Sequence, residues 1–377
     1  MEEVIRINGG HLLNGSIKVS GAKNATVALI PATVLAGDKV DIYGIPDISD
    51  VQSLKEILEF LNVKVEEVAP NEIIADPTHM ENKVLDIPAV GRLRASYYFM
   101  GALLGRYRKV VMRMPGGCDL GPRPIDLHLK GFEALGATVE YNEELSEYNI
   151  YADELVGSRI YLDFASVGAT LNILMAAVYA KGRTIIENAA REPEIIDCIT
   201  MLNKMGALIR GGGTSTIVID GVEELHGCFH EIIPDRIEAG TYIILSAAMA
   251  DHVMIENVIP YHLDSLISKL KEMGVNIVAS LDHVDVYSSP ALKHTNIKTM
   301  PYPGFPTDMQ AQFMAMLAVS EGTGLVTETV FENRFMHVDE LKRMGAQIKI
   351  DGRTSVVEGV PTLTGCQVKA TDLRAGA

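Results

Sequence analysis

A cysteine, an arginine and an aspartate lie within the glycine- and proline-rich segment Pro115 to Gly131, PGGCDLGPRPIDLHLKG. Glycines on both sides of Cys118 leave its backbone able to move, so we expect the thiol not to be packed. A thiol beside a cation such as Arg123 is suited to deliver a proton under a closing lid. The alternative is an exposed surface turn with an incidental cysteine. The segment favours the first interpretation, an enzyme that acts on an anionic substrate.

The composition excludes several classes of protein. With 377 residues and 47% hydrophobic content, the chain is expected to form two domains. The net charge of -16 argues against a nucleic-acid or membrane partner, so any anionic ligand must be held by a local group of cations. The 4 cysteines lack short spacings, the first residues are acidic, and the uncharged run 164–180 is typical of a buried helix. We therefore expect a cytoplasmic protein.

A junction between a helix and a strand recurs along the chain. Leu or Met is followed by Gly-Ala or Gly-Val and then by alternating residues that begin a strand. The glycines are Gly136, Gly206, Gly274 and Gly345, which are 70, 68 and 71 residues apart. Glycine at this point predicts a left-handed helix C-cap, and Asn62 takes its place in one copy.

Segments of about a dozen residues that are apolar nearly all round recur with the same period. They begin at Gly21, Leu93, Val167, Ala239 and Thr307. Such segments predict helices that are buried on every face, with sheets outside them. The repeating unit is predicted to be β-α-β-α-β-β. A sixth copy begins at Thr371, so we expect a sixth unit that is truncated.

Three other patterns are weaker indications of function. His226, Cys228 and His230 alternate, but without a fourth ligand they do not predict a metal site. The glycines at 211–213 precede a strand and favour a hairpin turn over a phosphate loop. The Gly-Thr-Gly at 322–324 lacks the third glycine of a dinucleotide fingerprint. We expect neither a metal nor a cofactor.

Several strings in order resemble one known family. They are GAKNA at Gly21, LRAS at Leu93, PGGCDLGPRPIDLH at Pro115, SVGAT at Ser166, IIENAAREPEI at Ile185, IPDRIEAGTY at Ile233, FPTDMQAQF at Phe305, TETVFENRFMH at Thr327 and ATDLRA at Ala370. The chain is similar over its whole length to the enolpyruvyl transferases, and within them to the UDP-N-acetylglucosamine 1-carboxyvinyltransferases.

The resemblance implies an α/β fold, an inside-out α/β barrel of two similar domains with the active site between them. Each domain is expected to hold three repeated units, with the sixth unit truncated. The first domain would comprise 1–22 plus 234–377, and the second 23–233, which carries the Cys118 loop. The implied crossovers lie near Lys23 and Pro234.

The resemblance also implies the reaction. The enolpyruvyl group of phosphoenolpyruvate moves to the 3'-hydroxyl of UDP-N-acetylglucosamine and phosphate is released, the first committed step of peptidoglycan synthesis. Cys118 matches the general acid at C3, which is also the site alkylated by fosfomycin, and Asp308 matches the base for the sugar hydroxyl. An aspartate at a helix start is otherwise most often an N-cap.

Most of the other matched residues are implied to bind substrate. Lys23 and Asn24 match contacts to phosphoenolpyruvate, where a lysine adds its charge to backbone N–H groups at a helix start, although a lysine there can also simply snorkel. Arg94 and Arg123 match arginines that bind substrate, although an arginine ahead of a helix can also be a solvated surface group. Arg334 and Arg374 match further arginines of the family's cleft. The uridine and sugar contacts are implied to be Arg123, Pro124, Ile125, Asp126, Leu127, Ser166, Val167 and Val330.

Two departures from the family pattern keep alternatives open. Phe164 stands where the family usually has a lysine, and a further family arginine would fall beyond Ala377. An inactive fragment that binds the sugar nucleotide is therefore one alternative. The shikimate-pathway enolpyruvyl transferase is another, although Cys118 and the string RPIDL argue against it.

Overall fold

The computed structural model describes residues 4–114, 125–289 and 291–372. The chain forms two compact units, each with its own hydrophobic core. Unit 1 comprises Met1–Val19, Arg236–Met300 and Gly304–Ala377, and unit 2 comprises Ser20–Asp235 and Pro301–Pro303.

The limits of unit 2 differ slightly from the predicted range 23–233. Unit 2 begins at Ser20 and ends its long segment at Asp235. Gly21 pairs with Pro234 in an isolated β-bridge, and the backbone N–H of Asp235 donates to the Ser20 carbonyl at 2.9 Å. These contacts attach both segments to unit 2, so the change of unit falls a few residues outside the predicted positions.

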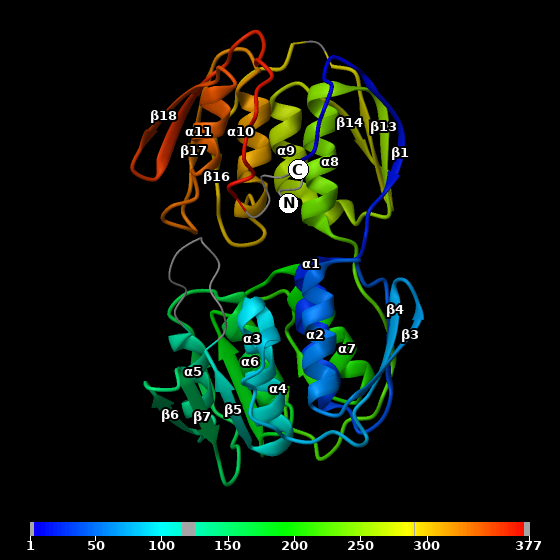
Figure 1. Cartoon of the computed structure of the whole chain (residues 1–377), viewed down its shortest axis with the longest axis vertical. Helices are drawn as coiled ribbons and strands as arrows, with labels where there is room; N and C mark the ends of the chain where they lie inside the picture. Colours follow the sequence, from blue (N-terminus) through cyan, green and yellow to red (C-terminus); the bar gives the residue numbers. More distant parts are fainter. Residues whose placement is uncertain (1–3, 115–124, 290, 373–377) are drawn as a thin grey trace. The chain divides into compact units, whose positions relative to one another are not determined.

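Unit 2 is built from helices and short strands in alternation (Figure 1). Its elements are α1 (Lys23–Ala32), η1 (Thr33–Leu35), β2 (Val40–Tyr43), α2 (Ser49–Phe60), β3 (Lys64–Ala69), β4 (Glu72–Asp76), α3 (Pro88–Arg92), η2 (Arg94–Tyr97), α4 (Tyr98–Tyr107), β5 (Lys109–Arg113), α5 (Asp126–Ala134), β6 (Thr138–Asn142), β7 (Glu147–Tyr151), β8 (Arg159–Tyr161), α6 (Val167–Ala177), β9 (Arg183–Glu187), α7 (Pro193–Lys204), β10 (Leu208–Arg210), β11 (Thr216–Asp220) and β12 (Phe229–Glu231).

Unit 1 follows the same alternation after its first strand. Its elements are β1 (Leu13–Lys18), α8 (Arg236–Met249), β13 (Ala250–Glu256), η3 (Pro260–Leu263), α9 (Asp264–Glu272), β14 (Asn276–Ala279), β15 (His283–Tyr287), β16 (Ile297–Lys298), η4 (Thr307–Met309), α10 (Gln310–Leu317), β17 (Thr323–Thr327), α11 (His337–Arg343), β18 (Gln347–Asp351) and β19 (Thr354–Glu358).

The sheets repeat one strand order. Among the described residues, the sheets of unit 2 run β12-β2-β4-β3, β5-β7-β6 and β10-β11-β9-β8, and those of unit 1 run β1-β13-β15-β14 and β16-β17-β19-β18. In each four-stranded sheet one edge strand is parallel to its neighbour and the other pairs are antiparallel. The succession β8-α6-β9-α7-β10-β11 has the predicted order of one unit.

The two units exchange their leading strands. The strand β1 precedes α1 in the chain but pairs in parallel with β13 of unit 1. Likewise β12 precedes α8 but pairs in parallel with β2 of unit 2. Each unit is therefore completed by a strand that is distant in sequence from the strand beside it.

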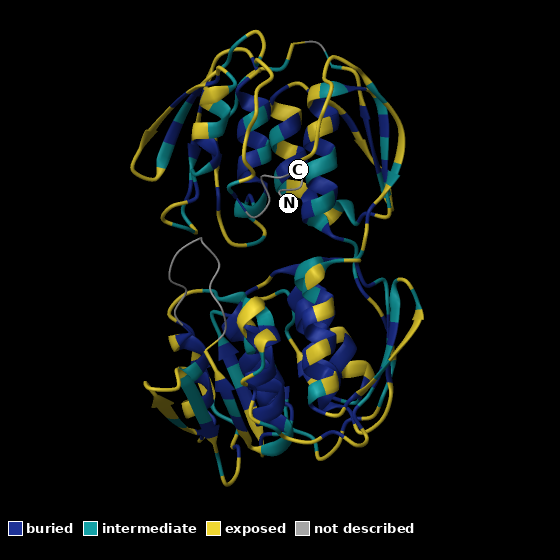
Figure 2. Cartoon of the chain, viewed as in Figure 1, coloured by how far each residue is buried: buried dark blue, intermediate teal, exposed yellow. Residues whose placement is uncertain are grey.

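The predicted caps are confirmed, and the predicted buried helices are confirmed in part, because α8 leaves Leu245 43% exposed. Glycines 136, 206, 274 and 345 have φ between 90° and 106°, and Asn62 has φ 63°. In α6 every residue from Gly168 to Ala177 is buried. The helices of each unit lie inside its sheets (Figure 1), and exposed residues occur on the strands and turns and also on helices such as α2 and α9 (Figure 2). The glycines at 211–213 lie in a turn between the antiparallel strands β10 and β11, as predicted.

Candidate functional site

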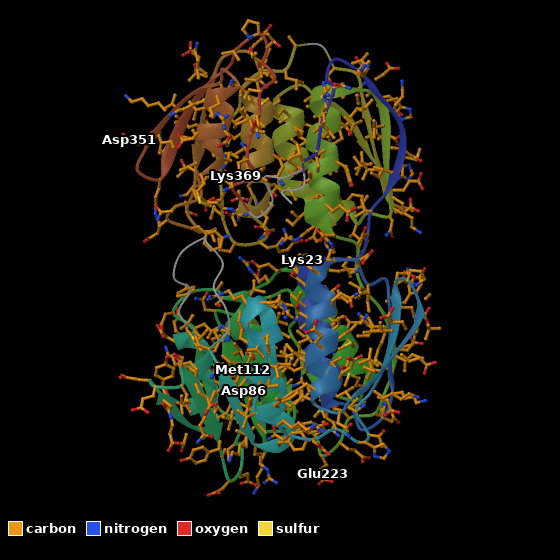
Figure 3. The ribbon with its side chains drawn as sticks, in the orientation of Figure 1. Lys23, Asp86, Met112, Glu223, Asp351 and Lys369 are labelled. Carbon is orange, nitrogen blue, oxygen red and sulfur yellow. The ribbon has the colours of Figure 1, made fainter. Side chains whose placement is uncertain are left out.

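Lys23 is the first residue of α1 (Figure 3). Both its backbone and its side chain have acidic partners. Its N–H donates to Asp235 Oδ2 at 2.9 Å, and its Nζ lies 2.9 Å from Asp50 Oδ2. The side chains of Lys23 and Asp50 are 27% and 23% exposed. An anion that binds at this helix start must therefore compete with the Asp50 carboxylate. Asn24, the second residue of α1, is half-buried.

The proton position on His128, a buried residue of α5, follows from its partners. The N–H of Gly101 donates to Asn172 Oδ1 at 2.8 Å, so Asn172 Nδ2 donates to His128 Nδ1 at 2.9 Å. Because Nδ1 accepts, the proton of the neutral ring is on Nε2. Burial, together with the charge of Arg94, lowers the pKa of His128 from 6.5 to about 3.

Three of the predicted segments meet around His128. The ring of Tyr97, in the η2 turn that Arg94 begins, lies edge-on to the His128 ring with centroids 4.9 Å apart. A Cβ on Gly168, in the first turn of α6, would lie 2.8 Å from Tyr97 Oη and 3.0 Å from His128 Cε1. The fold therefore brings η2, the start of α5 and the start of α6 together, with no room for a side chain at position 168.

The predicted residues at the starts of α5 and α6 differ in what they can offer a ligand. Ile125 and Leu127 are buried in the core, at 3% and 8% exposure, so only their main chains can reach a ligand. Asp126 is exposed. The Ser166 hydroxyl caps α6 by accepting from the N–H of Ala169 at 3.3 Å, and Val167 is half-buried.

The neutral state of His128 predicts a dependence of stability on pH. The unfolded chain protonates this ring near pH 6.5, whereas the fold keeps it neutral to about pH 3. Between these two pH values the unfolded state binds more protons than the folded state. The contribution of the neutral His128 ring to the free energy of unfolding is therefore complete above pH 6.5 and is lost as the pH falls toward 3. At about pH 5 the loss is about 2 kcal/mol. Urea denaturation at about pH 7 and pH 5 should show this extra loss in the wild type relative to His128→Gln.

The exposed His226 supplies the control for this measurement. The variant His226→Gln should follow the wild-type dependence, because it leaves the buried His128 and its partners unchanged. Equal losses in the wild type and in His128→Gln would contradict the neutral assignment of His128.

In unit 1, Arg334 lies between two carboxylates. Its Nη1 donates to Asp308 Oδ1 at 2.7 Å, and its Nε donates to Asp372 Oδ2 at 2.9 Å. The side chains of Arg334 and Asp372 are 2% and 1% exposed, whereas that of Asp308 is 22% exposed. Asp308 is therefore the member of this group that retains access to solvent.

The structure does not support the alternative in which Asp308 is an N-cap. The cap positions of η4 and α10 are Pro306 and Met309, and neither has a side-chain cap hydrogen bond in the described part of the chain. The carboxylate of Asp308 accepts from Arg334 instead. Its side chain is consequently held by a buried cation rather than by a helix terminus.

The surroundings of Arg334 shift the pKa of Arg334 itself and that of His337. Burial opposes the charge of Arg334, but the carboxylates of Asp308 and Asp372 outweigh it and raise the pKa of Arg334 above its ordinary value. The guanidinium also lies over the Phe331 ring, 5.5 Å from its centroid. Burial lowers the pKa of the nearby His337 to about 4. Neither ring nitrogen of His337 has a hydrogen-bond partner among the described residues.

Val330 lies in the connection between β17 and α11 and is 40% exposed. Its backbone N–H donates to Glu328 Oε1 at 2.8 Å. The turn therefore presents the Val330 side chain to solvent while its main chain is anchored to a buried carboxylate.

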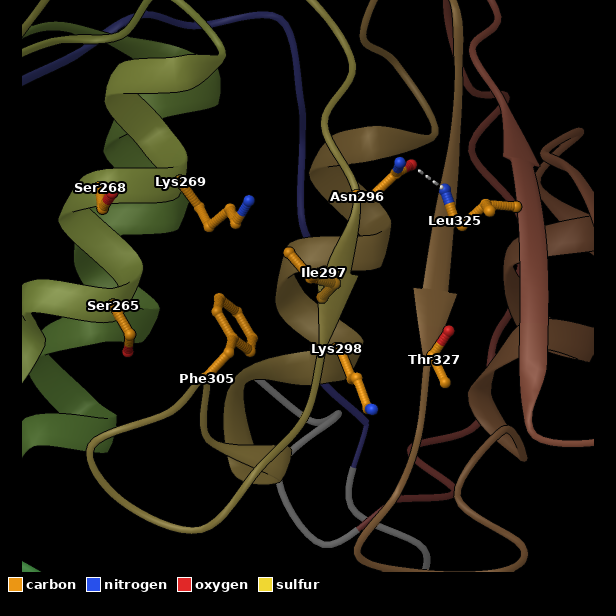
Figure 4. A pocket seen from close by; sticks show the side chains of 9 residues that line it. All are labelled: Ser265, Ser268, Lys269, Asn296, Ile297, Lys298, Phe305, Leu325 and Thr327. Atoms are coloured by element: carbon orange, nitrogen blue, oxygen red, sulfur yellow. Dashed lines mark hydrogen bonds between the residues drawn. The ribbon is translucent and has the colours of Figure 1, made fainter.

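A hollow of ≈ 430 Å³ in unit 1 involves none of the predicted site residues (Figure 4). It lies between α9 and the strands β16 and β17. Several of its polar groups already have protein partners. Lys269 pairs with Glu272 at 2.7 Å, and Asn296 Oδ1 accepts from the N–H of Leu325 at 2.8 Å. This hollow is therefore a weaker candidate than the groups around His128 and Arg334.

Across residues 4–114, 125–289 and 291–372, no His, Cys, Asp and Glu side chains are grouped so that they could hold a metal ion. His230, one of the alternating residues, is buried, and its Nε2 lies 2.8 Å from Asp197 Oδ1. Within the same ranges we find no helix with the length and apolar character needed to span a membrane.

Comparison with known proteins identifies the family. The family described as EPSP synthase (3-phosphoshikimate 1-carboxyvinyltransferase) matches residues 7–377. The chain belongs to this enolpyruvyl transferase family. UDP-N-acetylglucosamine 1-carboxyvinyltransferase 2 of Bacillus cereus is 56% identical over 375 residues, which cover 100% of this chain and 87% of that protein. The protein of the same name from Bacillus subtilis (strain 168) is 54% identical over 378 residues, with the same coverage.

Solved structures of enolpyruvyl transferases share the fold. The enolpyruvyl transferase NikO from Streptomyces tendae is 26% identical, with a TM-score of 0.88 over 98% of this chain and 88% of that chain. An EPSP synthase from Acinetobacter baumannii is 20% identical, with a TM-score of 0.73 over 94% of this chain and 84% of that chain, and supports the fold. The α/β class predicted from the sequence is thus confirmed as an enolpyruvyl transferase fold.

Four of the predicted site residues lie outside the described residues. They are Cys118, Arg123, Pro124 and Arg374. The others fall into two sets, one in unit 2 (Lys23, Asn24, Arg94, Ile125, Asp126, Leu127, Ser166, Val167) and one in unit 1 (Asp308, Val330, Arg334).

The sequence analysis missed three buried polar residues beside the predicted ones. His128, Glu328 and Asp372 are 5%, 0% and 7% exposed. Each lies within a string that carries the family resemblance, namely PIDLH, TETVFENRF and ATDLR. A titratable residue inside such a string is a signal that could have drawn attention to them.

Proposed function

We propose that this chain transfers the enolpyruvyl group of phosphoenolpyruvate to the 3'-hydroxyl of UDP-N-acetylglucosamine, with release of phosphate. The observation that carries the proposal is the 56% identity, over the whole chain, to a protein named for this reaction. The reaction would supply a precursor of peptidoglycan. We also propose that the protein works in the bacterial cytoplasm, without nucleic-acid or membrane partners.

The proposed reaction has two steps, an addition and an elimination, in which Cys118 and Asp308 transfer protons. Asp308 takes the proton of the 3'-hydroxyl as its oxygen bonds to C2 of phosphoenolpyruvate, and Cys118 gives a proton to C3. A proton then leaves C3 as the bond from C2 to the phosphate oxygen breaks, which restores the double bond and releases phosphate. Asp308 suits the role of base because it is partly exposed and has a fixed partner in Arg334.

The remaining residues are assigned to binding. Lys23 and Asn24 would contact phosphoenolpyruvate, with Lys23 exchanging its Asp50 partner for the substrate anion. The arginines proposed to hold substrate anions are Arg94, Arg123 and Arg374, whereas the buried Arg334 is proposed to act in the site by holding the Asp308 carboxylate. The contacts proposed for the sugar nucleotide are Pro124, Ile125, Asp126, Leu127, Ser166, Val167 and Val330.

The finer organisation of the fold is part of the same proposal. We propose that unit 1 and unit 2 correspond to the two expected domains, each an inside-out α/β barrel of three repeated units. The sixth unit would be the one that begins at Thr371. The repeated strand order and the exchange of β1 and β12 support this arrangement.

Phosphate release tests the function directly. Purified chain incubated with phosphoenolpyruvate and UDP-N-acetylglucosamine should release one phosphate for each enolpyruvyl nucleotide formed. Shikimate 3-phosphate should neither replace the sugar nucleotide nor compete with it. Binding of UDP-N-acetylglucosamine without phosphate release would instead indicate a nucleotide-binding fragment, and release with shikimate 3-phosphate would indicate the shikimate-pathway enzyme.

Covalent labelling by fosfomycin is expected at Cys118 in the presence of UDP-N-acetylglucosamine. The reason is that a thiol poised to act as an acid has a readily formed thiolate, which is the nucleophile. Peptide mass spectrometry should find the adduct on Cys118 and not on the buried Cys198, whose thiol has its pKa raised by burial. The exposed Cys366 is the control for nonspecific alkylation. An unmodified Cys118 peptide would count against an assembled site.

A further inference from the structure

Glu328 is a fully buried carboxylate directly after β17, and it accepts four hydrogen bonds. Its Oε1 accepts from the Thr299 hydroxyl at 2.7 Å and from the N–H groups of Val330 and Phe331 at 2.8 and 3.1 Å. Its Oε2 accepts from the Thr307 hydroxyl at 2.8 Å. These donors satisfy a group that would otherwise be costly to bury, and all of them belong to segments near the predicted residues.

The bond to Thr307 links Glu328 to the buried arginine. Because the Thr307 hydroxyl donates its proton to Glu328, its oxygen can accept from Arg334 Nη1, which lies 3.1 Å away. The same Nη1 donates to Asp308 Oδ1 at 2.7 Å. The hydrogen bonds therefore run from Arg334 to Thr307 and from Thr307 to Glu328. The Glu328 carboxylate orients the Thr307 hydroxyl so that its oxygen can accept from Arg334.

The other oxygen of Glu328 fixes the turn that carries Val330. Two consecutive backbone N–H groups, those of Val330 and Phe331, point at Oε1. Thr299, which also donates to Oε1, accepts from the N–H of Thr329 at 2.9 Å. One carboxylate thus holds both the Val330 turn and the η4 turn that carries Asp308.

We propose that Glu328 is a positioning residue that aligns Asp308 and the Val330 turn toward the same sugar nucleotide. The proposal rests on the proposed function, in which Asp308 takes the proton of the sugar hydroxyl and Val330 contacts the nucleotide. Glu328 touches neither substrate in this assignment and acts through Thr307 and through the main chain of the turn. Loss of its carboxylate therefore displaces the base and the nucleotide contact together.

The variant Glu328→Gln tests this with almost no change in shape. Its amide oxygen can still accept at Oε1, but its NH₂ group donates toward Thr307, where the carboxylate accepts. The Thr307 oxygen then meets two donors, and its own proton has lost its acceptor. We expect kcat/KM for UDP-N-acetylglucosamine to fall by about 100-fold, as for a misplacement of about 1 Å, and the Kd of the nucleotide to rise.

Two substitutions of Thr307 separate positioning from folding. Thr307→Val removes the hydroxyl that joins Arg334 to Glu328, and kcat/KM should fall by about ten-fold or more. Thr307→Ser keeps the hydroxyl and should stay within about two-fold of the wild type. Because Glu328 and Thr307 act through one link, the double variant Glu328→Gln/Thr307→Val should be little worse than Glu328→Gln. Additive losses would overturn the proposed link.

Asp285 offers a matched control elsewhere in unit 1. It is a carboxylate of β15, 7% exposed, that lies 2.8 Å from His252 Nε2. Asp285→Asn should leave kcat/KM unchanged even if it lowers the thermal midpoint as much as Glu328→Gln does. If Glu328→Gln keeps wild-type kcat/KM and Kd in an active chain, the inference fails and the proposed function stands. If the wild type binds the nucleotide without releasing phosphate, the proposed reaction fails, and the Kd values alone decide the role of Glu328.

Discussion

Replacing Asp308 with asparagine is expected to lower kcat for phosphate release by about 10³-fold, within the range typical of a general base. The amide oxygen of asparagine can still accept from Arg334 Nη1, which now lies 2.7 Å from the carboxylate. It cannot take a proton from the 3'-hydroxyl of the sugar nucleotide. The loss should therefore appear mainly in kcat, with little change in the KM for phosphoenolpyruvate. Steady-state phosphate release on the wild type and the variant measures both quantities.

Asp264 provides the control for the loss of a negative charge at a helix start. It is the first residue of α9 and is exposed. Asp264→Asn removes the same charge from the same unit and should leave kcat within about two-fold of the wild type. If Asp308→Asn retains more than a tenth of wild-type kcat, Asp308 is not the base.

The parts of the fold that depend on one or two residues could be predicted from the sequence. A helix that ends in a left-handed residue requires glycine or asparagine, and Gly136 and Asn62 adopt φ 95° and 63° as expected. A helix without a polar face must be covered on all sides, and α6 is buried from Gly168 to Ala177. These features depend on one residue or one short segment, so the sequence of that segment is enough to predict them.

The pairing of the leading strands is not a local property. Leu13 of β1 pairs with Ala250 of β13, and Phe229 of β12 pairs with Asp41 of β2. Nothing in these short strands distinguishes the distant neighbour from a nearer one, because the pattern of a strand specifies its face and not its partner. The exchange of β1 and β12 between the units is therefore seen only in the fold.

The same limit applies to the candidate site. The sequence placed Arg334 and Asp308 in the site by resemblance, but the pairing of Arg334 with Asp372 joins residues 38 positions apart. His128 likewise meets Asn172 across 44 positions, and that contact decides which ring nitrogen carries the proton. A sequence shows which groups can titrate, whereas burial and partners determine how they do so.

Replacing Arg334 with methionine is expected to destabilise unit 1 by about 3–5 kcal/mol, the usual cost of removing one member of a buried ion pair. Asp372, with a side chain that is 1% exposed, would lose its ion pair with Arg334. The contacts of the guanidinium with Thr307 and the Phe331 ring would be lost as well. Urea denaturation followed by circular dichroism measures the change, and phosphate release should be abolished in the same variant.

A second substitution distinguishes the loss of charge pairing from a loss of packing. In Arg334→Met/Asp372→Leu both members of the buried ion pair are replaced by apolar side chains, so stability should recover relative to Arg334→Met while activity should not. Arg343, which is 54% exposed and paired with Glu340 at 2.8 Å, is the control, and Arg343→Met should cost about 0.5 kcal/mol or less. If the double variant were no more stable than Arg334→Met, packing would be the main contribution of Arg334. Recovery of stability without activity would instead mean that the buried ion pair serves to position Asp308. The apolar replacement restores the stability of unit 1 but leaves the Asp308 carboxylate without the guanidinium that holds it.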